Sequence, residues 1–187
     1  MSDIKAILST SWHMIKEAYI DETINSERAL QSILYCSLYH ALPNHHHVIF
    51  VEPNIHGFIP DLMILNRKDM IVDCILEIKC SPHWWHTENS ISHDLDKLQY
   101  FSKLSGSEIE LDVFGPLRKL DPNTGGWIGG KPKYLISNET IFGFVMLARK
   151  NDIHERDKLN HPISKLQQFL LLTGITDPDT EIIFTIQ

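Results

Sequence analysis

The chain has 187 residues, of which 43% are hydrophobic and 22% charged, and its formal net charge is −7 at pH 7. This length can bury one substantial core but is short for two independent domains, so we expect a single domain over residues 1–187. The acidic balance provides no broad attraction for a polyanion, so a nucleic-acid ligand would need a local basic surface or bound divalent cations.

Targeting and redox signals are weak in this sequence. No segment joins a basic start to an apolar run and a small-residue cleavage site, and no apolar run approaches the roughly 20 residues of a membrane span. The cysteines Cys36, Cys74 and Cys80 lack the spacing of a zinc knuckle or an iron-sulfur cluster. We therefore expect a soluble protein of the reducing cytoplasm that makes no membrane contact.

The first predicted elements are two helices. Residues 3–19 are moderately amphipathic, and a second helix is predicted over residues 26–42, where Pro43 ends it. Glu27 stands one turn before Leu30, so its carboxylate should point roughly toward the core. The inward stripe of this helix is expected to consist of Leu30, Ile33, Leu34, Leu38, Ala41 and Leu42.

Three strands are predicted next, at residues 47–53, 61–65 and 70–80. The polar turn of residues 66–69 separates the last two strands, which favours an antiparallel meander.

The rest of the chain is predicted to contain two more helices and two more strands. Residues 92–104 form a helix with Leu95, Leu98, Phe101 and Leu104 on one side, and the glycine-rich region 115–133 is an irregular loop or hairpin. Residues 140–149 have the continuous apolar character of a buried central strand. A short helix at residues 163–172 and a strand at residues 181–186 complete the prediction.

The strand ILEIKC carries the residues that point to chemistry. Because side chains alternate along a strand, Glu77 and Lys79 share one face with Ile75. Charges inside an otherwise apolar strand are costly unless they are paired or have a function. The opposite face of the strand is expected to hold Cys74, Leu76, Ile78 and Cys80.

A second carboxylate should lie close to this strand. Asp61 opens the preceding strand, and a meander would bring it beside Glu77. Two carboxylates held in this way suit Mg²⁺ or Mn²⁺, which can lower the pKa of a bound water and neutralise charge on a phosphate. Lys79 would position the water or stabilise the transition state.

These residues resemble a known family. Ile59-Pro60-Asp61, followed by Leu76-Glu77-Ile78-Lys79, is similar to the motif of the PD-(D/E)XK nuclease superfamily, which includes restriction endonucleases, Holliday-junction resolvases and RecB-type nucleases. The resemblance covers roughly residues 26–150. It implies an α/β, restriction endonuclease-like αβββαβ core, with a central mixed sheet flanked by helices.

The resemblance also implies roles for individual residues. Asp61 and Glu77 would be metal ligands, the Ile78 carbonyl a further oxygen ligand, and Lys79 the catalytic lysine. Glu27 would lie at the edge of the site in a metal-linked or water-linked role. The implied function is divalent-metal-dependent hydrolysis of nucleic acid, with DNA as the expected substrate, and many relatives act as dimers.

Other residues are candidates for substrate contact. Lys97, Gln99 and Tyr100 resemble a helix motif of some family branches whose residues touch substrate or support the lysine, but a solvated face or ordinary packing is the alternative. Trp84 or Trp85 could stack on a base or pack in the fold. Candidates for phosphate contact, in turns or loops expected near the site, are Arg67, Lys68, Arg118, Lys119, Lys131 and Lys133.

Simpler interpretations remain open for each residue. Glu77 and Lys79 could be an ion pair on a solvated sheet face, Asp61 could merely begin a strand, and Glu27 could complement a helix dipole. The consecutive histidines His45, His46 and His47 project in different directions and do not fit a zinc site, and no P-loop pattern is present.

Two other functions follow from these interpretations. One is a catalytically inactive binding or assembly module that reuses the nuclease scaffold. The other is an unrelated α/β protein with protein partners, which a fold that does not cluster Asp61, Glu77 and Lys79 would favour.

Overall fold

The computed structural model describes residues 4–43, 46–81, 88–111, 119–120, 123, 127–128, 131–148, 161–176 and 183–187. The helices within these residues are α1 (Ile4–Ile20), α2 (Glu27–Ala41), α3 (Glu88–Lys103) and the short 3₁₀ helix η2 (Pro162–Lys165). The strands are β1 (His47–Val51), β2 (Leu62–Asn66), β3 (Ile71–Ser81), β4 (Glu108–Glu110), β5 (Lys119–Leu120), β6 (Trp127–Ile128), β7 (Lys133–Ala148), β8 (Phe169–Ile175) and β9 (Ile183–Ile186).

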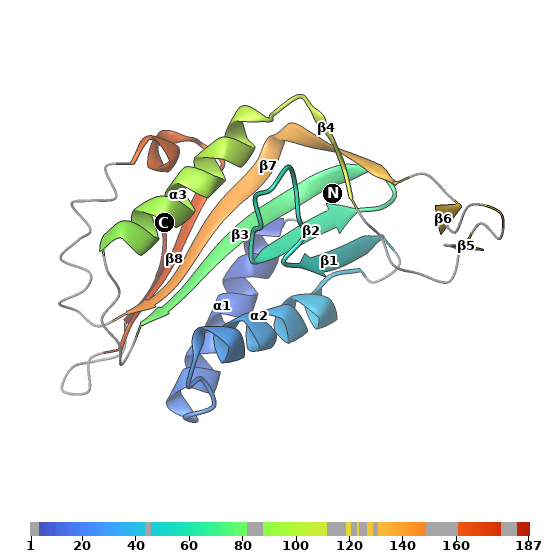
Figure 1. The fold of residues 1–187 in the computed structure, drawn as a ribbon. Helices are drawn as coiled ribbons and strands as arrows, with labels where there is room; N and C mark the ends of the chain where they lie inside the picture. The colour runs from blue at the N-terminus through green and yellow to red at the C-terminus, as the bar shows by residue number, and fades with distance from the viewer. Residues whose placement is uncertain are drawn as a thin grey trace.

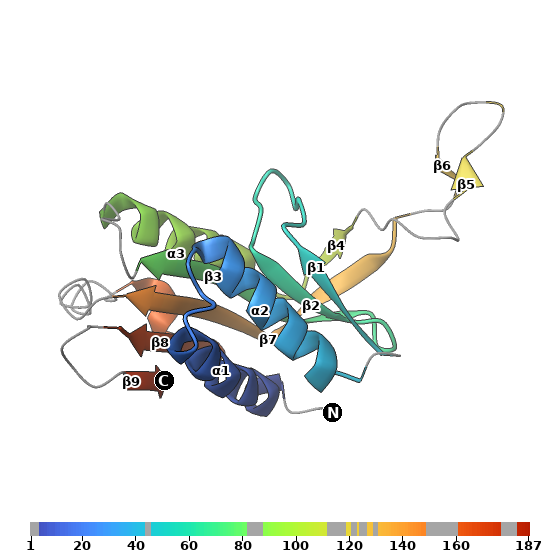
Figure 2. The ribbon, with the colours of Figure 1, turned by 90° about the horizontal axis from the view of Figure 1, so that it is seen from below.

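The fold is an α/β arrangement around one mixed sheet. Seven strands make up this sheet in the order β1–β2–β3–β7–β8–β9, with β4 paired to the first part of β7. The helices α1 and α2 lie on one face of the sheet and α3 lies on the other, as the two perpendicular views of Figure 1 and Figure 2 show. The predicted order of helix, three strands, helix and strand is present as α2, β1, β2, β3, α3 and β7.

Each face of the sheet has its own hydrophobic core, and β3 contributes to both. Cys74, Leu76, Ile78 and Cys80 pack with the leucines and isoleucines of α1 and α2. Ile75 packs on the other face with Leu95, Leu98 and Phe101 of α3. The predicted alternation along β3 is therefore confirmed, and Glu77 and Lys79 belong to the face that α3 covers.

A side-chain cap begins α2 and fixes the position of Glu27. The Ser26 hydroxyl accepts a hydrogen bond from the Ala29 N–H at 3.1 Å, which satisfies one of the donors left open at a helix start. Glu27 is then the first helical residue. Leu30, Leu34, Leu38 and Leu42 are buried as expected and Ile33 is partly buried, but Ala41, the last residue of α2, is exposed, so the expectation for it was wrong.

The antiparallel meander β1–β2–β3 is confirmed by the strand registers, in which Val51 pairs with Leu62 and Leu62 pairs with Leu76. The turn between β2 and β3 is closed by the Asn66 side chain, which accepts hydrogen bonds from the Lys68 and Asp69 N–H groups.

The central strands β3, β7 and β8 run parallel. β7 begins at Lys133, earlier than the predicted start at Thr140, because its first part alternates between exposed and buried residues around the polar Ser137-Asn138-Glu139. Arg149, the predicted end of this strand, lies outside the described residues.

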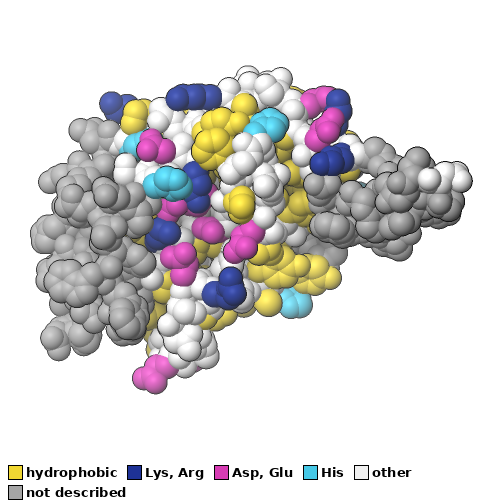
Figure 3. All heavy atoms as spheres, viewed as in Figure 1, with side chains coloured by type: hydrophobic (Ala, Val, Ile, Leu, Met, Phe, Trp, Pro, Cys, Tyr) yellow, Lys and Arg dark blue, Asp and Glu magenta, His cyan; other side chains and the backbone are white. Residues whose placement is uncertain are grey.

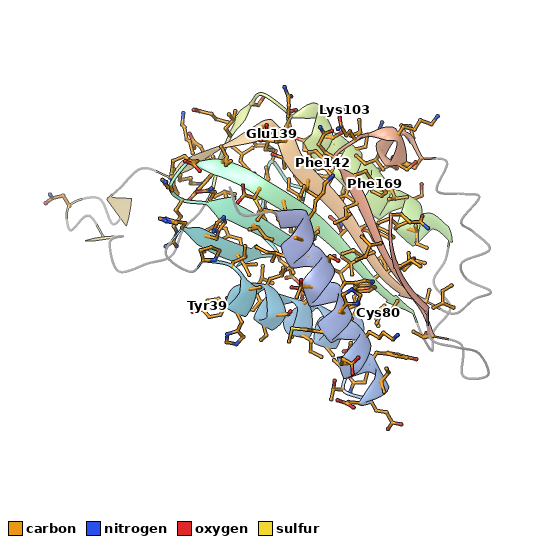
Figure 4. All side chains as sticks on the ribbon, turned by 180° about the vertical axis from the view of Figure 1, so that it is seen from behind. Tyr39, Cys80, Lys103, Glu139, Phe142 and Phe169 are labelled. Atoms are coloured by element: carbon orange, nitrogen blue, oxygen red, sulfur yellow. The ribbon has the colours of Figure 1, made fainter. Side chains whose placement is uncertain are left out.

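The helix predicted at residues 163–172 is wrong. The short helix η2 ends at Lys165, and residues from Phe169 onward form β8, which lies between β7 and β9 in the sheet. Figure 4 shows Phe142 of β7 and Phe169 of β8, which are direct register partners, side by side. A short apolar run buried on both faces has no periodicity that separates a strand from a buried helix, and that ambiguity caused the error.

Two further features bear on the sequence predictions. Among the parts of the chain that the structure describes, no helix is long and apolar enough to cross a membrane. Within the region predicted as a loop or hairpin, β5 and β6 pair antiparallel, so the described residues there adopt the hairpin.

Candidate active site

The candidate site forms where β2 separates from β3. Leu62 and Leu76 are the last register pair between these strands, so within the described residues no strand flanks the edge of β3 beyond Leu76 on that side. Two carboxylates take the place of the missing strand there. Asp61 Oδ2 accepts a hydrogen bond from the Ile78 N–H at 2.6 Å, and Glu27 Oε2 accepts one from the Cys80 N–H at 3.3 Å.

This arrangement also fixes the direction of the Ile78 carbonyl. The N–H and C=O groups of one strand residue point toward the same edge of the strand. Because the Ile78 N–H faces Asp61, the Ile78 carbonyl faces the same edge. The three oxygen ligands implied by the family resemblance, from Asp61, Glu77 and Ile78, thus lie at one end of one strand.

Glu77 is a buried carboxylate with one oxygen unsatisfied. Its side chain is 1% exposed, and Oε2 lies 2.5 Å from the Lys97 Nζ of α3. The other oxygen, Oε1, is buried without a hydrogen-bond partner among the described residues. A buried acceptor of this kind is costly unless a cation or water completes it.

Lys79 is held by different carboxylates. Its Nζ lies 2.9 Å from Asp94 Oδ2 and 3.7 Å from Glu27 Oε1. Glu77 and Lys79 therefore pair with α3 and α2 and are not a solvated pair on an open sheet face.

Asp94 is the site residue that sequence reasoning missed. It is buried in the second turn of α3, where Oδ1 binds Lys97 Nζ at 3.0 Å and Oδ2 binds Lys79. The signal was present in the sequence, because Asp94 stands four residues before the inward-facing Leu98. The same spacing argument had directed attention to Glu27.

Lys97 links the whole cluster. Besides Glu77 and Asp94, its ammonium lies 3.5 Å from the Ile59 carbonyl, two residues before Asp61. Its side chain is 15% exposed, which rules out the solvated helix face that was the alternative.

The cluster has more negative than positive groups. The carboxylates of Glu27, Asp61, Glu77 and Asp94 surround the two ammonium groups of Lys79 and Lys97. Burial, followed by the Asp61 charge, raises the pKa of Glu77 from 4.5 to about 9, and Lys97 opposes this rise. Burial likewise raises the pKa of Asp61 from 3.8 to about 6, against the hydrogen bond from Ile78. The excess negative charge is therefore held by protons when no other cation is present.

The residues present fit a divalent cation that keeps most of its waters. Among the described residues, no three His, Cys, Asp or Glu side chains converge into a ready-made metal cluster. The fit rests instead on the unsatisfied Oε1 of Glu77, the nearby Asp61 carboxylate and the Ile78 carbonyl. Mg²⁺ and Mn²⁺ bind in this way, with one or two carboxylates and several waters.

The other predicted contact residues divide into two groups. Tyr100 lies beside the site, where its ring stacks on Phe58 and its hydroxyl lies 3.3 Å from His56 Nδ1. Gln99 is half-buried on the same helix. Arg67 and Lys68 were expected near the site, but they lie in the turn at the opposite end of β3 from Glu77, about 20 Å away at the rise of a strand.

The remaining candidate residues are not placed at the site by the described part of the chain. Lys131 and Lys133 are exposed at the start of β7, and Lys133 pairs with Glu108 and Glu110. His47 forms a structural pair with Asp73 at 3.1 Å, far along β3 from Glu77. Five further candidates lie outside the described part of the chain, either as whole residues or with their side chains. They are His45, Trp84, Trp85, Arg118 and Lys119.

Comparisons with known proteins add no identification. No family model matches the chain, and no curated protein or solved structure matches it. The site must therefore be interpreted from its own geometry.

Proposed function

We propose that this protein is a divalent-metal-dependent nuclease of the PD-(D/E)XK type, which hydrolyses phosphodiester bonds, most favourably in DNA. The observation that carries the proposal is the convergence of Asp61, Glu77 and Lys79 at one end of β3, with the Glu77 Oε1 atom buried and unsatisfied. The element order α2, β1, β2, β3, α3, β7 supports a restriction endonuclease-like core.

The proposed roles follow from the contacts. Asp61, Glu77 and the Ile78 carbonyl would hold Mg²⁺ or Mn²⁺, which lowers the pKa of a bound water and neutralises charge on the phosphate. Lys79 would orient the attacking water, since Asp94 and Glu27 hold its ammonium at the same strand end. Glu27 serves as a positioning residue, because it binds both Lys79 and the Cys80 N–H.

A cleavage assay tests this proposal. The wild type would be incubated with linear, circular, branched and single-stranded DNA, and with RNA, in Mg²⁺ or Mn²⁺. Lys79→Met should lower the cleavage rate by roughly 10²- to 10³-fold, the usual loss for one group that stabilises a transition state. The matched control is Lys103→Met at the far end of α3, which should cleave at the wild-type rate.

Two outcomes of the cleavage assay would contradict the nuclease proposal. Wild-type protein that cuts none of these substrates contradicts the proposal, as does a Lys79→Met variant with full activity. Circular dichroism of the variant confirms that any lost activity does not reflect unfolding.

The second candidate is a catalytically inactive binding or assembly module on the same scaffold. The observation in its favour is that Lys97 already contacts Glu77 and Asp94, so that the site can be partly neutralised by the chain's own ammonium groups. Calorimetric titration with Mn²⁺ separates the two candidates. If the site is active, the wild type should bind Mn²⁺ and the Asp61→Asn variant should not. An inactive module should bind no Mn²⁺ in either form.

A further inference from the structure

An exposed pair of aromatic rings lies beside the candidate active site. Phe58 and Tyr100, here called the aromatic ledge, stack with ring centroids 4.0 Å apart and an interplanar angle of 24°. Phe101 and Phe58 form a T-shaped pair with an interplanar angle of 77°, and Phe58 is still 36% exposed. Tyr100 covers one face of the Phe58 ring, and more than a third of the Phe58 surface still reaches solvent. A further flat ring could pack against this exposed part of Phe58.

The loop that carries Phe58 is held in a defined conformation. Ile55 and Phe58 exchange two backbone hydrogen bonds, at 2.8 and 2.9 Å, and close a two-residue hairpin. His56 and Gly57 between them have positive φ values of 52° and 88°, as in a type I′ turn. Ile55 is 1% exposed and anchors the hairpin in the core. Phe58 is therefore presented to solvent from a preorganised position.

The ledge is connected to the catalytic cluster on both of its sides. Phe58 stands three residues before Asp61, and Tyr100 stands three residues after Lys97 on α3. Lys97 joins the two elements, since its ammonium contacts the Ile59 carbonyl and Glu77. Figure 3 shows hydrophobic side chains and a histidine gathered next to the mixed acidic and basic side chains on this face. A nucleic acid bound at the catalytic cluster would therefore pass close to the ledge.

The charge of the site favours contact with bases over contact with the phosphate backbone. Duplex binding draws most of its affinity from Lys and Arg side chains that neutralise phosphates. Here Lys79 and Lys97 are already paired with carboxylates, and the whole chain has a net charge of −7. Stacking of a base on an aromatic ring adds roughly 1–3 kcal/mol per base without a basic side chain of its own, and it requires that the base be unpaired.

We propose that the aromatic ledge of Phe58 and Tyr100 is a subsite for an unpaired nucleobase next to the cleaved phosphodiester, so that the preferred substrate is single-stranded or frayed nucleic acid. This inference rests on the proposed nuclease function and names its substrate class. Phe58 contacts the base directly, and Tyr100 supports the Phe58 ring from behind with its hydroxyl near His56.

Binding measured without cleavage tests the subsite. Fluorescence anisotropy in Ca²⁺, a divalent cation that binds oxygen ligands, would compare a labelled oligothymidylate of about 20 nucleotides with a duplex of equal length, and gel electrophoresis would confirm that both stay uncut. The full-length wild type should bind the single strand more tightly, and Phe58→Ala should weaken this binding by roughly 5-fold or more, as expected for one lost base stack. Phe58→Trp should retain binding, whereas Phe58→Leu, which keeps an apolar side chain without a ring, should lose most of it.

Tyr39→Ala is the matched control. Tyr39 is also exposed, at 48%, and stacked on a tyrosine, but it lies at the opposite end of α2 from Glu27, and Figure 4 shows it well apart from Cys80 of β3. This variant should bind both oligonucleotides as the wild type does.

The ledge and the nuclease proposal can fail separately. Equal weakening of single-strand and duplex binding in Phe58→Ala, or no weakening, overturns the ledge even if the wild type cleaves DNA. If the wild type binds no single-stranded oligonucleotide, the base subsite is also overturned, and a protein would then be the expected ligand of the exposed rings. Single-strand binding that depends on Phe58 in a protein that cleaves nothing supports the ledge and contradicts the nuclease.

Discussion

Replacement of Lys97 by methionine should destabilise the metal-free protein strongly. The Lys97 ammonium lies 2.5 Å from Glu77 and 3.0 Å from Asp94, and both carboxylates are buried. Methionine keeps the aliphatic length and has a similar helix propensity, so the change removes mainly the charge. Glu77 would then lose the ammonium group that contacts it among the described residues, and Asp94 would keep only Lys79.

The size of the loss follows from the burial of the pair. Removal of one partner from a buried ion pair costs about 3–5 kcal/mol, and we expect the lower end because Glu77, with its pKa raised to about 9, already carries a proton near neutral pH. About 3 kcal/mol corresponds to a fall in Tm of roughly 6–12 °C for a chain of this size. The contribution of Glu77 to this loss should be the same at pH 5.5 and pH 8, where Glu77 carries a proton with or without Lys97, and it should grow above about pH 9, where only the variant retains that proton.

Urea denaturation in EDTA at pH 8 measures this effect, with Lys103→Met as the surface control on the same helix. The double variant Glu77→Gln/Lys97→Met should be more stable than the sum of the single changes implies, because both changes remove the same contact between Lys97 and Glu77. A loss below about 1 kcal/mol for Lys97→Met, the range of exposed ion pairs, would refute the reasoning, as would strict additivity in the double variant.

Three further predictions concern the carboxylates, the helix cap and the core. In EDTA, the free energy of unfolding should fall as pH rises from about 5 to 9, because the folded state keeps protons on Asp61 and Glu77 that the unfolded chain has already released. The Glu77→Gln variant should show a weaker dependence on pH, and a free energy of unfolding that rises with pH would contradict this prediction. Ser26→Ala should cost about 1 kcal/mol in thermal or chemical denaturation through loss of the α2 cap, and Ser26→Asp should retain stability; equal stability of all three proteins would exclude the cap. Gly143→Ala should cost about 1–3 kcal/mol in the same assay, since its new methyl group would overlap the buried Leu76 side chain from the neighbouring strand, and a neutral effect would mean that Leu76 can move away.

The sequence predicted the parts of the fold that have a clear period. Alternation along β3 placed Glu77 and Lys79 on one face, and the meander brought Asp61 to the same strand end, as the structure has them. The inward position of Glu27 followed from its spacing to Leu30. Predictions failed where periodicity gives no answer, as in β8, whose apolar residues are buried on both sides of the sheet.

The partners of the site residues were harder to predict than the residues themselves. Which carboxylate meets which lysine depends on how α3 crosses the sheet, and the sequence does not encode this crossing in a local pattern. Asp94 and the role of Lys97 were missed for this reason. Arg67 and Lys68 were placed wrongly because a turn next to β3 in sequence lies at the end of the strand away from Glu77.

The dependence of cleavage on divalent metal tests the central claim most directly. Initial cleavage rates of single-stranded and duplex DNA would be measured for the wild type and Asp61→Asn over a titration of Mn²⁺ from an EDTA-treated state. The wild type should be inactive in EDTA and gain activity that saturates with Mn²⁺, and Asp61→Asn should stay inactive throughout. Cleavage that persists in EDTA, or that Asp61→Asn retains, would contradict a metal-dependent site built on Asp61 and Glu77.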